Sequence, residues 1–149
     1  LWTATMIKTR FGHVKTIMEF GGSYGGLCYL LSGMMRWKKY WFVEIRYCLD
    51  LARICLKDAN IDFWDTSVVN DKIKEVENID LFVSEYSFDQ LNQEGLKKYR
   101  WMLEKSRNAL LVTSDSKIES LLRDIYDNID HLIMGDMNIY ICGNKENNE

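Results

Sequence analysis

The chain has 149 residues and a formal net charge of -3, and 47% of its residues are hydrophobic while 28% are charged. This length suits one domain with a single core, and this balance is that of an ordinary globular protein. The acidic balance argues against nucleic acid as the main partner, because phosphate binding usually leaves a basic footprint. No apolar run approaches the roughly 20 residues of a membrane-spanning helix, so we expect no membrane partner either.

The chain has no initiator Met and no charged-then-apolar leader at its start. We therefore expect residues 1–13 to be an N-terminal extension that has been shortened, with no signal peptide. Four cysteines lie among apolar neighbours without any CxxC spacing: Cys28, Cys48, Cys55 and Cys142. Core thiols of this kind behave as small hydrophobes, which indicates a reducing cytoplasm rather than a disulfide or metal role.

Strands and helices alternate along the chain. Five apolar segments predict strands: 14–20, 41–45, 61–64, 81–84 and 109–113. Segment 41–45, WFVEI, is nearly all apolar and bulky, as a strand covered on both faces should be. The chain closes with 131–134, a Gly-Asp turn and 138–142, which indicate a β-hairpin before a polar tail at 143–149.

Helical spacing of apolar residues predicts a helix over 27–35, and residues 66–78 are expected to be a polar loop with a short helix. The second helix has one predicted buried stripe: Cys48, Leu51, Ala52, Cys55 and Leu56. A third helix is expected from Phe88, with Asp89 placed to cap it. The last helix follows a capping box at 116–119 and has its own stripe: Ile118, Leu121, Leu122, Ile125 and Ile129.

Alternating strands and helices imply a parallel sheet with helices on both faces. The sequence therefore predicts one α/β domain over 1–149, with a Rossmann-like, doubly wound seven-stranded sheet that is mostly parallel and ends in a C-terminal antiparallel β-hairpin. In such sheets, ligands bind at the carboxyl ends of the strands, where the strand order reverses. The stretch EFGGSYGG, 19–26, lies at this point between the first strand and the first helix.

Two glycine fingerprints come close to this stretch. A dinucleotide fingerprint needs glycine at 21, 23 and 26, and a methyltransferase fingerprint needs an acid at 19 with glycine at 21, 23 and 25, so both miss at Ser23. The acid distinguishes them, because Glu19 repels a pyrophosphate but attracts the ammonium group of S-adenosylmethionine. Glu44 ends the second strand, where a carboxylate accepts hydrogen bonds from ribose hydroxyls in either case. S-adenosylmethionine is therefore favoured over NAD.

Three segments, EFGGSYGGLCYLL, WFVEI with CLDLARICLKDANI, and IDLFVSEYSFDQL, resemble the class I S-adenosylmethionine-dependent methyltransferases. Within that class, the loop with Tyr24 and the segment SEYSFDQL are most similar to the sugar O-methyltransferases. The resemblance covers residues 14–113 and implies a seven-stranded sheet that ends in a hairpin. It also implies S-adenosyl-L-methionine as the cofactor and a small-molecule acceptor, for which a sugar is expected.

The resemblance implies this set of cofactor-binding residues: Glu19, Gly21, Gly22, Ser23, Gly25, Glu44 and Ser84. Glu19 and the glycine turn are expected at the methionine part and Glu44 at the ribose, while Ser84 and Glu85 line the pocket below the methyl group. The chain departs from the family pattern at two positions. Ser23 replaces the middle glycine and brings either strain or a new hydroxyl contact, and Arg46 stands where it can pair with Glu44 and compete with the ribose.

Methyl transfer to an oxygen needs an in-line acceptor hydroxyl and often a general base. Glu85 is the expected base, whereas His13 and His131 are expected to be structural. Trp64 is expected in the core rather than on adenine, and Asp65 is placed for either an adenine contact or a loop role. No combination of His, Cys and carboxylate has metal-ligand spacing, so we expect no metal.

The sequence thus favours a cytoplasmic S-adenosylmethionine-dependent methyltransferase that acts on a hydroxyl of a sugar or another small molecule. A non-catalytic, methyltransferase-like partner domain is the alternative, supported by Ser23, the compact length and the lack of a clear base. An NAD-dependent oxidoreductase is a third and weaker reading.

Overall fold

A single seven-stranded sheet organises the chain in a computed structural model, which describes residues 1–57 and 60–143. The strand order is β3-β2-β1-β4-β5-β7-β6, with the first five strands parallel and β7 antiparallel to both of its neighbours. The strands are β1 (Thr16–Phe20), β2 (Lys39–Glu44), β3 (Ile61–Asp65), β4 (Ile79–Glu85), β5 (Ser106–Thr113), β6 (Asn128–Met134) and β7 (Met137–Gly143). The predicted fold class, with its closing hairpin, is confirmed.

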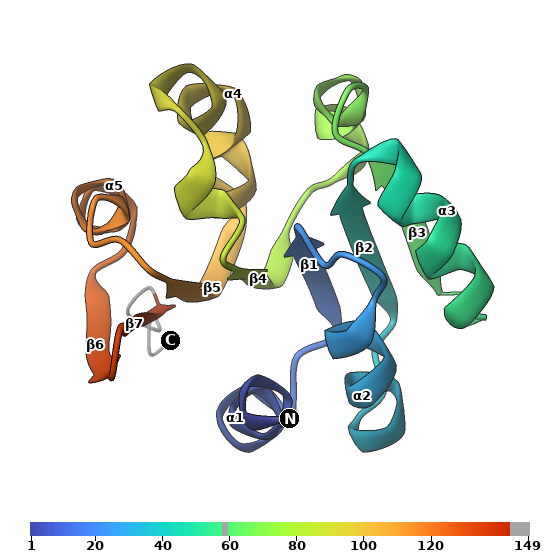
Figure 1. Ribbon diagram of the computed structural model, residues 1–149, viewed down its shortest axis with the longest axis horizontal. Helices are drawn as coiled ribbons and strands as arrows, with labels where there is room; N and C mark the ends of the chain where they lie inside the picture. Colours follow the sequence, from blue (N-terminus) through green and yellow to red (C-terminus); the bar gives the residue numbers. More distant parts are fainter. Residues whose placement is uncertain (58–59, 144–149) are drawn as a thin grey trace.

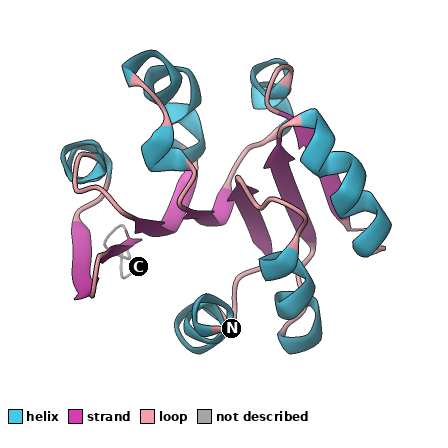
Figure 2. Cartoon of the chain, in the orientation of Figure 1, coloured by secondary structure: helices cyan, strands magenta, loops and turns pink. Residues whose placement is uncertain are grey.

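Helices cover both faces of the sheet (Figure 1). They are α1 (Trp2–Phe11), α2 (Gly26–Met34), α3 (Arg46–Cys55), η1 (Val69–Glu75), η2 (Phe88–Gln90), α4 (Gln93–Glu104) and α5 (Ile118–Ile125), of which η1 and η2 are 3-10 helices. The first three pack on one face and the other four on the opposite face, each layer closing its own buried cluster. Figure 2 shows the strands between these two helical layers.

Alternate residues of each central strand enter the two clusters. Ile17 and Leu81 point into the cluster under α1 and α2, whereas Met18 and Phe82 point into the cluster under α4 and α5. Successive side chains of a strand point to opposite faces, and a parallel sheet covered on both faces therefore needs apolar residues at nearly every position. This arrangement leaves the carboxyl ends of the strands as the place where polar side chains gather.

Five local expectations need correction. Residues 2–11, expected only as an extension, form α1, which buries Ala4, Ile7 and Phe11 against the sheet layer. The stripe predicted for α3 is confirmed at Ala52 and Leu56, which are buried, but it is wrong at Leu51 and Cys55, which are exposed, because the helix turns Leu49 to the sheet instead. The remaining corrections concern the helix ends on the other face.

Helix α5 begins at Ile118 without a side-chain cap, so the capping box at 116–119 does not form. It ends at Ile125, and Ile129 lies in β6 instead of on the helix stripe. Helix α4 is capped by Asn92, whose side chain accepts from the Gly95 amide over 2.8 Å, and not by Asp89.

No helix among the described residues combines the length and the apolar character that crossing a membrane requires.

Candidate functional site

The glycine turn between β1 and α2 has an unusual backbone. Gly21, Ser23 and Gly25 have φ angles of 78°, 54° and 90°, and the Gly25 amide closes the turn by donating to the Gly22 carbonyl over 2.9 Å. Left-handed conformations favour glycine, so two of the three positions are occupied as expected and Ser23 is not. Its side chain is exposed, and its hydroxyl makes no hydrogen bond with the residues that the structure describes.

Close packing also explains the glycines. A Cβ atom at Gly21 would lie 2.1 Å from the Ser87 side chain, and one at Gly22 would lie 2.7 Å from Glu19 Cδ and 2.5 Å from the Phe42 ring. The turn therefore folds directly over the Glu19 carboxyl group. The density of glycine in this stretch reflects the close approach of the turn to β1, β2 and the segment after β4.

Glu19 is the most deeply buried charged residue of the site. It is 3% exposed on β1, and its Oε2 accepts a hydrogen bond of 2.7 Å from the Tyr40 hydroxyl on β2. The pKa of Glu19 is raised to about 8; burial is the largest cause, the Tyr40 hydrogen bond opposes it, and the nearby Glu85 and Glu44 act in the same direction as burial. A buried carboxyl group whose pKa is shifted by burial and by neighbouring charges indicates a candidate functional site.

Glu44 ends β2 and is joined to the glycine turn. Its Oε2 accepts from the Ser23 amide over 2.8 Å, and its Oε1 accepts from the Ile45 amide over 2.7 Å. Arg46 pairs with Asp50 at 3.8 Å and has no ion pair with Glu44 in the described part of the chain, so the expected competition does not occur. The carboxylate is thus fixed at the carboxyl ends of β1 and β2, beside the switch point between β1 and β4, and a carboxylate at the end of the second strand binds a ribose in related folds.

Glu85 ends β4 and faces the same space from the other side of β1. The Thr3 hydroxyl of α1 donates a hydrogen bond to Glu85 Oε1, which ties the first turn of α1 to the end of β4. The next residue, Tyr86, has a φ angle of 52°, a conformation that costs free energy in a non-glycine residue and is concentrated at functional sites. The backbone therefore turns sharply just after Glu85.

These groups enclose a pocket of about 480 Å³ at the carboxyl ends of β1 and β4, a volume within the range of small-molecule sites. It is lined by Leu1, Thr3, Glu19, Gly21, Gly22, Ser23, Tyr24, Gly26, Leu27, Leu30 and Glu85. No Lys, Arg or His is among these lining residues. The acidic side chains of this lining suit an ammonium or sulfonium group, and they do not suit a phosphate.

The structure brings together Glu19, Gly21, Gly22, Ser23 and Glu85, while Glu44 adjoins them through the Ser23 amide. The other two expected cofactor residues lie outside the pocket lining. Gly25 is buried against Leu56, and Ser84 is 1% exposed with its Oγ accepting from the Phe88 amide over 3.1 Å.

The residues weighed for adenine and for structural roles lie as follows. Trp64 is 7% exposed and packs on Trp41, with ring centroids 6.1 Å apart, so it is a core residue as expected. Asp65 accepts from the Ser67 amide and hydroxyl, over 2.9 and 2.8 Å, and these bonds lower its pKa. His131 stacks on Tyr140 in the hairpin, with a centroid distance of 4.4 Å. Within 1–57 and 60–143, no three His, Cys, Asp or Glu side chains are grouped as a metal site requires.

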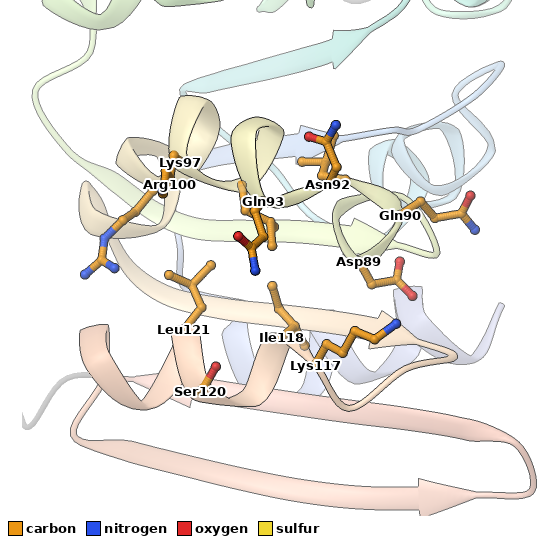
Figure 3. A pocket seen from close by; sticks show the side chains of 12 residues that line it. Asp89, Gln90, Asn92, Gln93, Lys97, Arg100, Lys117, Ile118, Ser120 and Leu121 are labelled. Atoms are coloured by element: carbon orange, nitrogen blue, oxygen red, sulfur yellow. The ribbon is translucent and has the colours of Figure 1, made fainter.

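A larger groove of about 690 Å³ lies between the η2–α4 segment and α5 (Figure 3). Two of its three cationic side chains are paired: Lys117 with Asp115 at 2.6 Å, and Arg100 with Glu104 at 2.6 Å; the third is Lys97. Asp89 lines this groove and accepts from the Ser114 amide over 3.2 Å, so the structure separates it from Glu85. None of the groups around the glycine turn reaches the groove, and we place the functional site in the smaller pocket.

No protein-family model and no curated protein matches the chain. Among solved structures, the methyltransferase domain of bacterial CtHen1-CN aligns with a TM-score of 0.74 and 12% identity, over 95% of this chain and 96% of that one. The chain has the fold of the S-adenosylmethionine-dependent methyltransferases. An O-methyltransferase family protein from Burkholderia thailandensis gives a TM-score of 0.75 and 8% identity over 95% of this chain and 55% of its own.

A third similar structure is a 16S rRNA methyltransferase from T. thermophilus (RsmC), in complex with AdoMet and guanosine. Its TM-score is 0.72 at 16% identity, and the alignment covers 97% of this chain and 42% of that one. The chain therefore spans about half the length of the Burkholderia thailandensis protein and of the T. thermophilus protein. The similarity extends over nearly all of this chain but establishes the fold alone.

Sequence reasoning missed two residues that shape the site. Tyr40 looks like any aromatic residue of a buried strand, and Thr3 lies in a segment where no element was expected. A weak signal for α1 was present in the helical spacing of Ala4, Ile7 and Phe11. Nothing in the spacing of the sequence could have paired Thr3 with Glu85, because 82 residues separate them.

Proposed function

We propose that the chain is a cytoplasmic S-adenosylmethionine-dependent methyltransferase that methylates a hydroxyl group of a sugar or another small molecule. One observation carries this proposal: in a methyltransferase fold, two acidic side chains, Glu19 and Glu85, flank a glycine turn over a pocket without basic side chains. A pyrophosphate-bearing cofactor such as NAD would be repelled from this pocket, whereas an ammonium and a sulfonium would be attracted. The complex of the RsmC relative with AdoMet agrees with this choice of cofactor.

The residues would divide the cofactor between them. Glu19 takes the ammonium group of the methionine part, and the turn from Gly21 to Gly25 supplies backbone amides to its carboxylate. Glu44 accepts hydrogen bonds from the ribose hydroxyls. Each of its oxygens already accepts from one backbone amide and can accept a further hydrogen bond. Ser84 supports the site indirectly, because its Oγ accepts from the Phe88 amide and so holds the segment that follows Glu85.

The bound cofactor supplies an electrophilic methyl group. Glu85 accepts the proton of the acceptor hydroxyl as the oxygen forms its bond to the methyl carbon and the bond from that carbon to sulfur breaks. The Thr3 hydroxyl holds one oxygen of Glu85, which leaves the other for the acceptor. Leu1, Leu27 and Leu30 provide the apolar part of the wall and reduce the access of water.

The charges at the carboxyl edge of the sheet favour a small acceptor over a nucleic acid. β1, β2, β3 and β4 each carry an acid at or next to their last residue: Glu19, Glu44, Asp65 and Glu85. A phosphate backbone approaching this edge would meet like charges, and no Lys, Arg or His side chain lines the pocket to compensate for them. A neutral, hydroxyl-rich acceptor avoids this cost.

Calorimetric titration with S-adenosylhomocysteine and, separately, with NADH tests the proposal. We expect binding of S-adenosylhomocysteine in the micromolar range and none of NADH. Glu19→Gln should weaken the binding by about tenfold or more, because the charge that meets the ammonium is lost. Glu94→Gln, which removes an exposed carboxylate from the first turn of α4, is the matched control. Binding of NADH alone would refute the proposal.

A non-catalytic partner domain is the second candidate, favoured by the engagement of both Glu44 oxygens with backbone amides. In that case the turn is complete without a ligand, and Glu44 serves only to hold it. The titration separates the two functions, since a partner domain of this kind shows no heat with S-adenosylhomocysteine at pH 8 while remaining folded.

A further inference from the structure

Among the residues that the structure describes, Tyr40 is the hydrogen-bond donor that holds the Glu19 carboxyl group from below. The residue is fully buried on β2, and its hydroxyl lies 2.7 Å from Glu19 Oε2. In the parallel register, Tyr40 pairs with Ile17, two residues before Glu19, so its side chain reaches along the same face of β1 to the carboxyl group. Trp37 packs against the Tyr40 ring, with centroids 5.0 Å apart, and fixes the direction of the hydroxyl.

The other side of the carboxyl group is turned to the pocket. Glu19 lines the pocket, and its Oε1 accepts no hydrogen bond from the residues that the structure describes. The glycine turn closes over Glu19, because a Cβ atom at Gly22 would lie 2.7 Å from its Cδ. One oxygen is therefore held by Tyr40, and the second is available to a ligand.

We propose that Tyr40 is a positioning residue, whose hydroxyl aligns Glu19 so that its second oxygen meets the ammonium group of bound S-adenosylmethionine, and that binding releases a proton from Glu19. This inference rests on the proposed cofactor. Charge balances in the step: neutral Glu19 loses its proton to solvent, and the resulting carboxylate pairs with the ammonium.

The surroundings of Glu19 explain why it holds a proton in the absence of a cation. Its pKa is raised to about 8, mainly by burial; the Tyr40 bond opposes this rise, and Glu85 from β4 and Glu44 from β2 contribute to it. Burial, Glu19 and the Cys28 thiol of α2 raise the pKa of Tyr40 well above its ordinary value, so Tyr40 remains a donor. No cationic side chain lines the pocket, and the ligand must therefore supply the positive charge.

The affinity for S-adenosylhomocysteine, which has the same ammonium group, should then depend on pH. Below pH 8 it should rise about tenfold per pH unit, and it should level off near pH 8, where Glu19 is ionised in the free protein. Tyr40→Phe should weaken binding at pH 7 by about ten- to a hundredfold, the usual effect of losing a hydrogen bond to a charged group. The same variant should move the plateau to higher pH.

The matched control is Tyr126→Phe. Tyr126 is also buried, 4% exposed, and its hydroxyl donates to the Leu103 carbonyl over 3.0 Å on the other face of the sheet. Calorimetry from pH 6 to pH 9 on the parent and both variants makes the comparison, with circular dichroism to verify folding. Only Tyr40→Phe should move the pH profile, and an unchanged profile in that variant would overturn the proposal.

A second measurement needs no variant. Titrations of the parent at pH 7 in two buffers of different ionisation enthalpy give the number of protons released, for which we expect about 0.9 per S-adenosylhomocysteine. Binding without proton release would overturn the role of Glu19 and Tyr40 but leave the proposed cofactor intact. Absence of binding at every pH would instead refute the proposed function.

Discussion

The Ser23 amide donates to Glu44 Oε2 over 2.8 Å and thereby joins the turn after β1 to the end of β2. Ser23 holds a left-handed backbone in this arrangement, with a φ angle of 54°. Glu44 also accepts from the Ile45 amide at the start of α3. One carboxylate thus connects two strand ends and a helix start, and both its structural and its binding roles can be measured.

Glu44→Ala should weaken binding of S-adenosylhomocysteine by about ten- to a hundredfold, because the ribose acceptors are lost at a typical cost of about 1.5–3 kcal/mol. It should also lower the free energy of unfolding by about 1–2 kcal/mol, because two backbone amides lose their acceptor. Calorimetry and urea unfolding measure the two effects. Glu77→Ala, at an exposed position before β4, is the control, and unchanged affinity in folded Glu44→Ala would remove Glu44 from the site.

Ser23→Gly tests the strain in the turn. A left-handed conformation costs a non-glycine residue about 1–2 kcal/mol, while glycine adds unfolded-state entropy of about half to one kcal/mol. We expect the variant to be as stable as the parent or up to about 1 kcal/mol more stable, and to bind S-adenosylhomocysteine at least as tightly. The Glu44 bond survives, because it uses the backbone amide.

Ser23→Ala is the control for this change, since alanine keeps the strained Cβ and removes the hydroxyl. It should not be more stable than the parent. A lower affinity together with a lower melting temperature in Ser23→Gly would show instead that the Ser23 hydroxyl serves the ligand, and Ser23→Ala should then lose the same affinity.

The periodicity of the sequence was sufficient for the sheet but not for every helix face. The four strands β1, β2, β4 and β5 are recognisable by consecutive bulky apolar residues, because both faces of the sheet are covered there. Helix α3 carries two overlapping stripes, one through Cys48 and Leu51 and one through Leu49 and Ala52, and only packing against β2 and β3 selects the second. Spacing alone could not distinguish them.

The candidate site was likewise only partly predictable from the sequence. Glu19, Glu44 and Glu85 were recognisable because they follow apolar strands in a chain order that the fold brings together. Their partners, Tyr40 and Thr3, were not recognisable, since both depend on long-range contacts. The predicted helix caps were wrong for a related reason. Several polar residues near each helix start can cap it, and tertiary contacts, such as that of Asp89 with Ser114, determine which of them does.

The stability of the protein should depend on the pH through Glu19. Its pKa is about 8 in the fold and 4.5 ordinarily, so the folded state holds the proton more strongly than the unfolded state. The contribution of Glu19 to stability is therefore greatest below pH 4.5. It falls by up to about 1.4 kcal/mol per pH unit between pH 4.5 and pH 8, and it is constant above pH 8.

Urea unfolding at pH 6 and pH 9 measures this contribution as a difference between the parent and Glu19→Gln. The parent should lose more stability than the variant between the two values, because glutamine has no proton to release. Equal losses would show that Glu19 is ionised at neutral pH in the fold, and its burial beneath the glycine turn would then need a cation already in place.

Thr3→Val tests the connection between α1 and the end of β4. Thr3 is 7% exposed, and its hydroxyl donates to the Glu85 carboxylate, which closes one wall of the pocket. Valine keeps the shape but not the donor, so the free energy of unfolding should fall by about 1–3 kcal/mol and hydrogen exchange should accelerate in α1. Thr3→Ser should retain most of the stability.

Thr5→Val is the control in the same helix, because the exposed Thr5 hydroxyl donates its hydrogen bond to the Leu1 carbonyl and not to β4. If Thr3→Val and Thr5→Val change exchange in α1 equally, the bond to Glu85 does not hold the helix over the pocket.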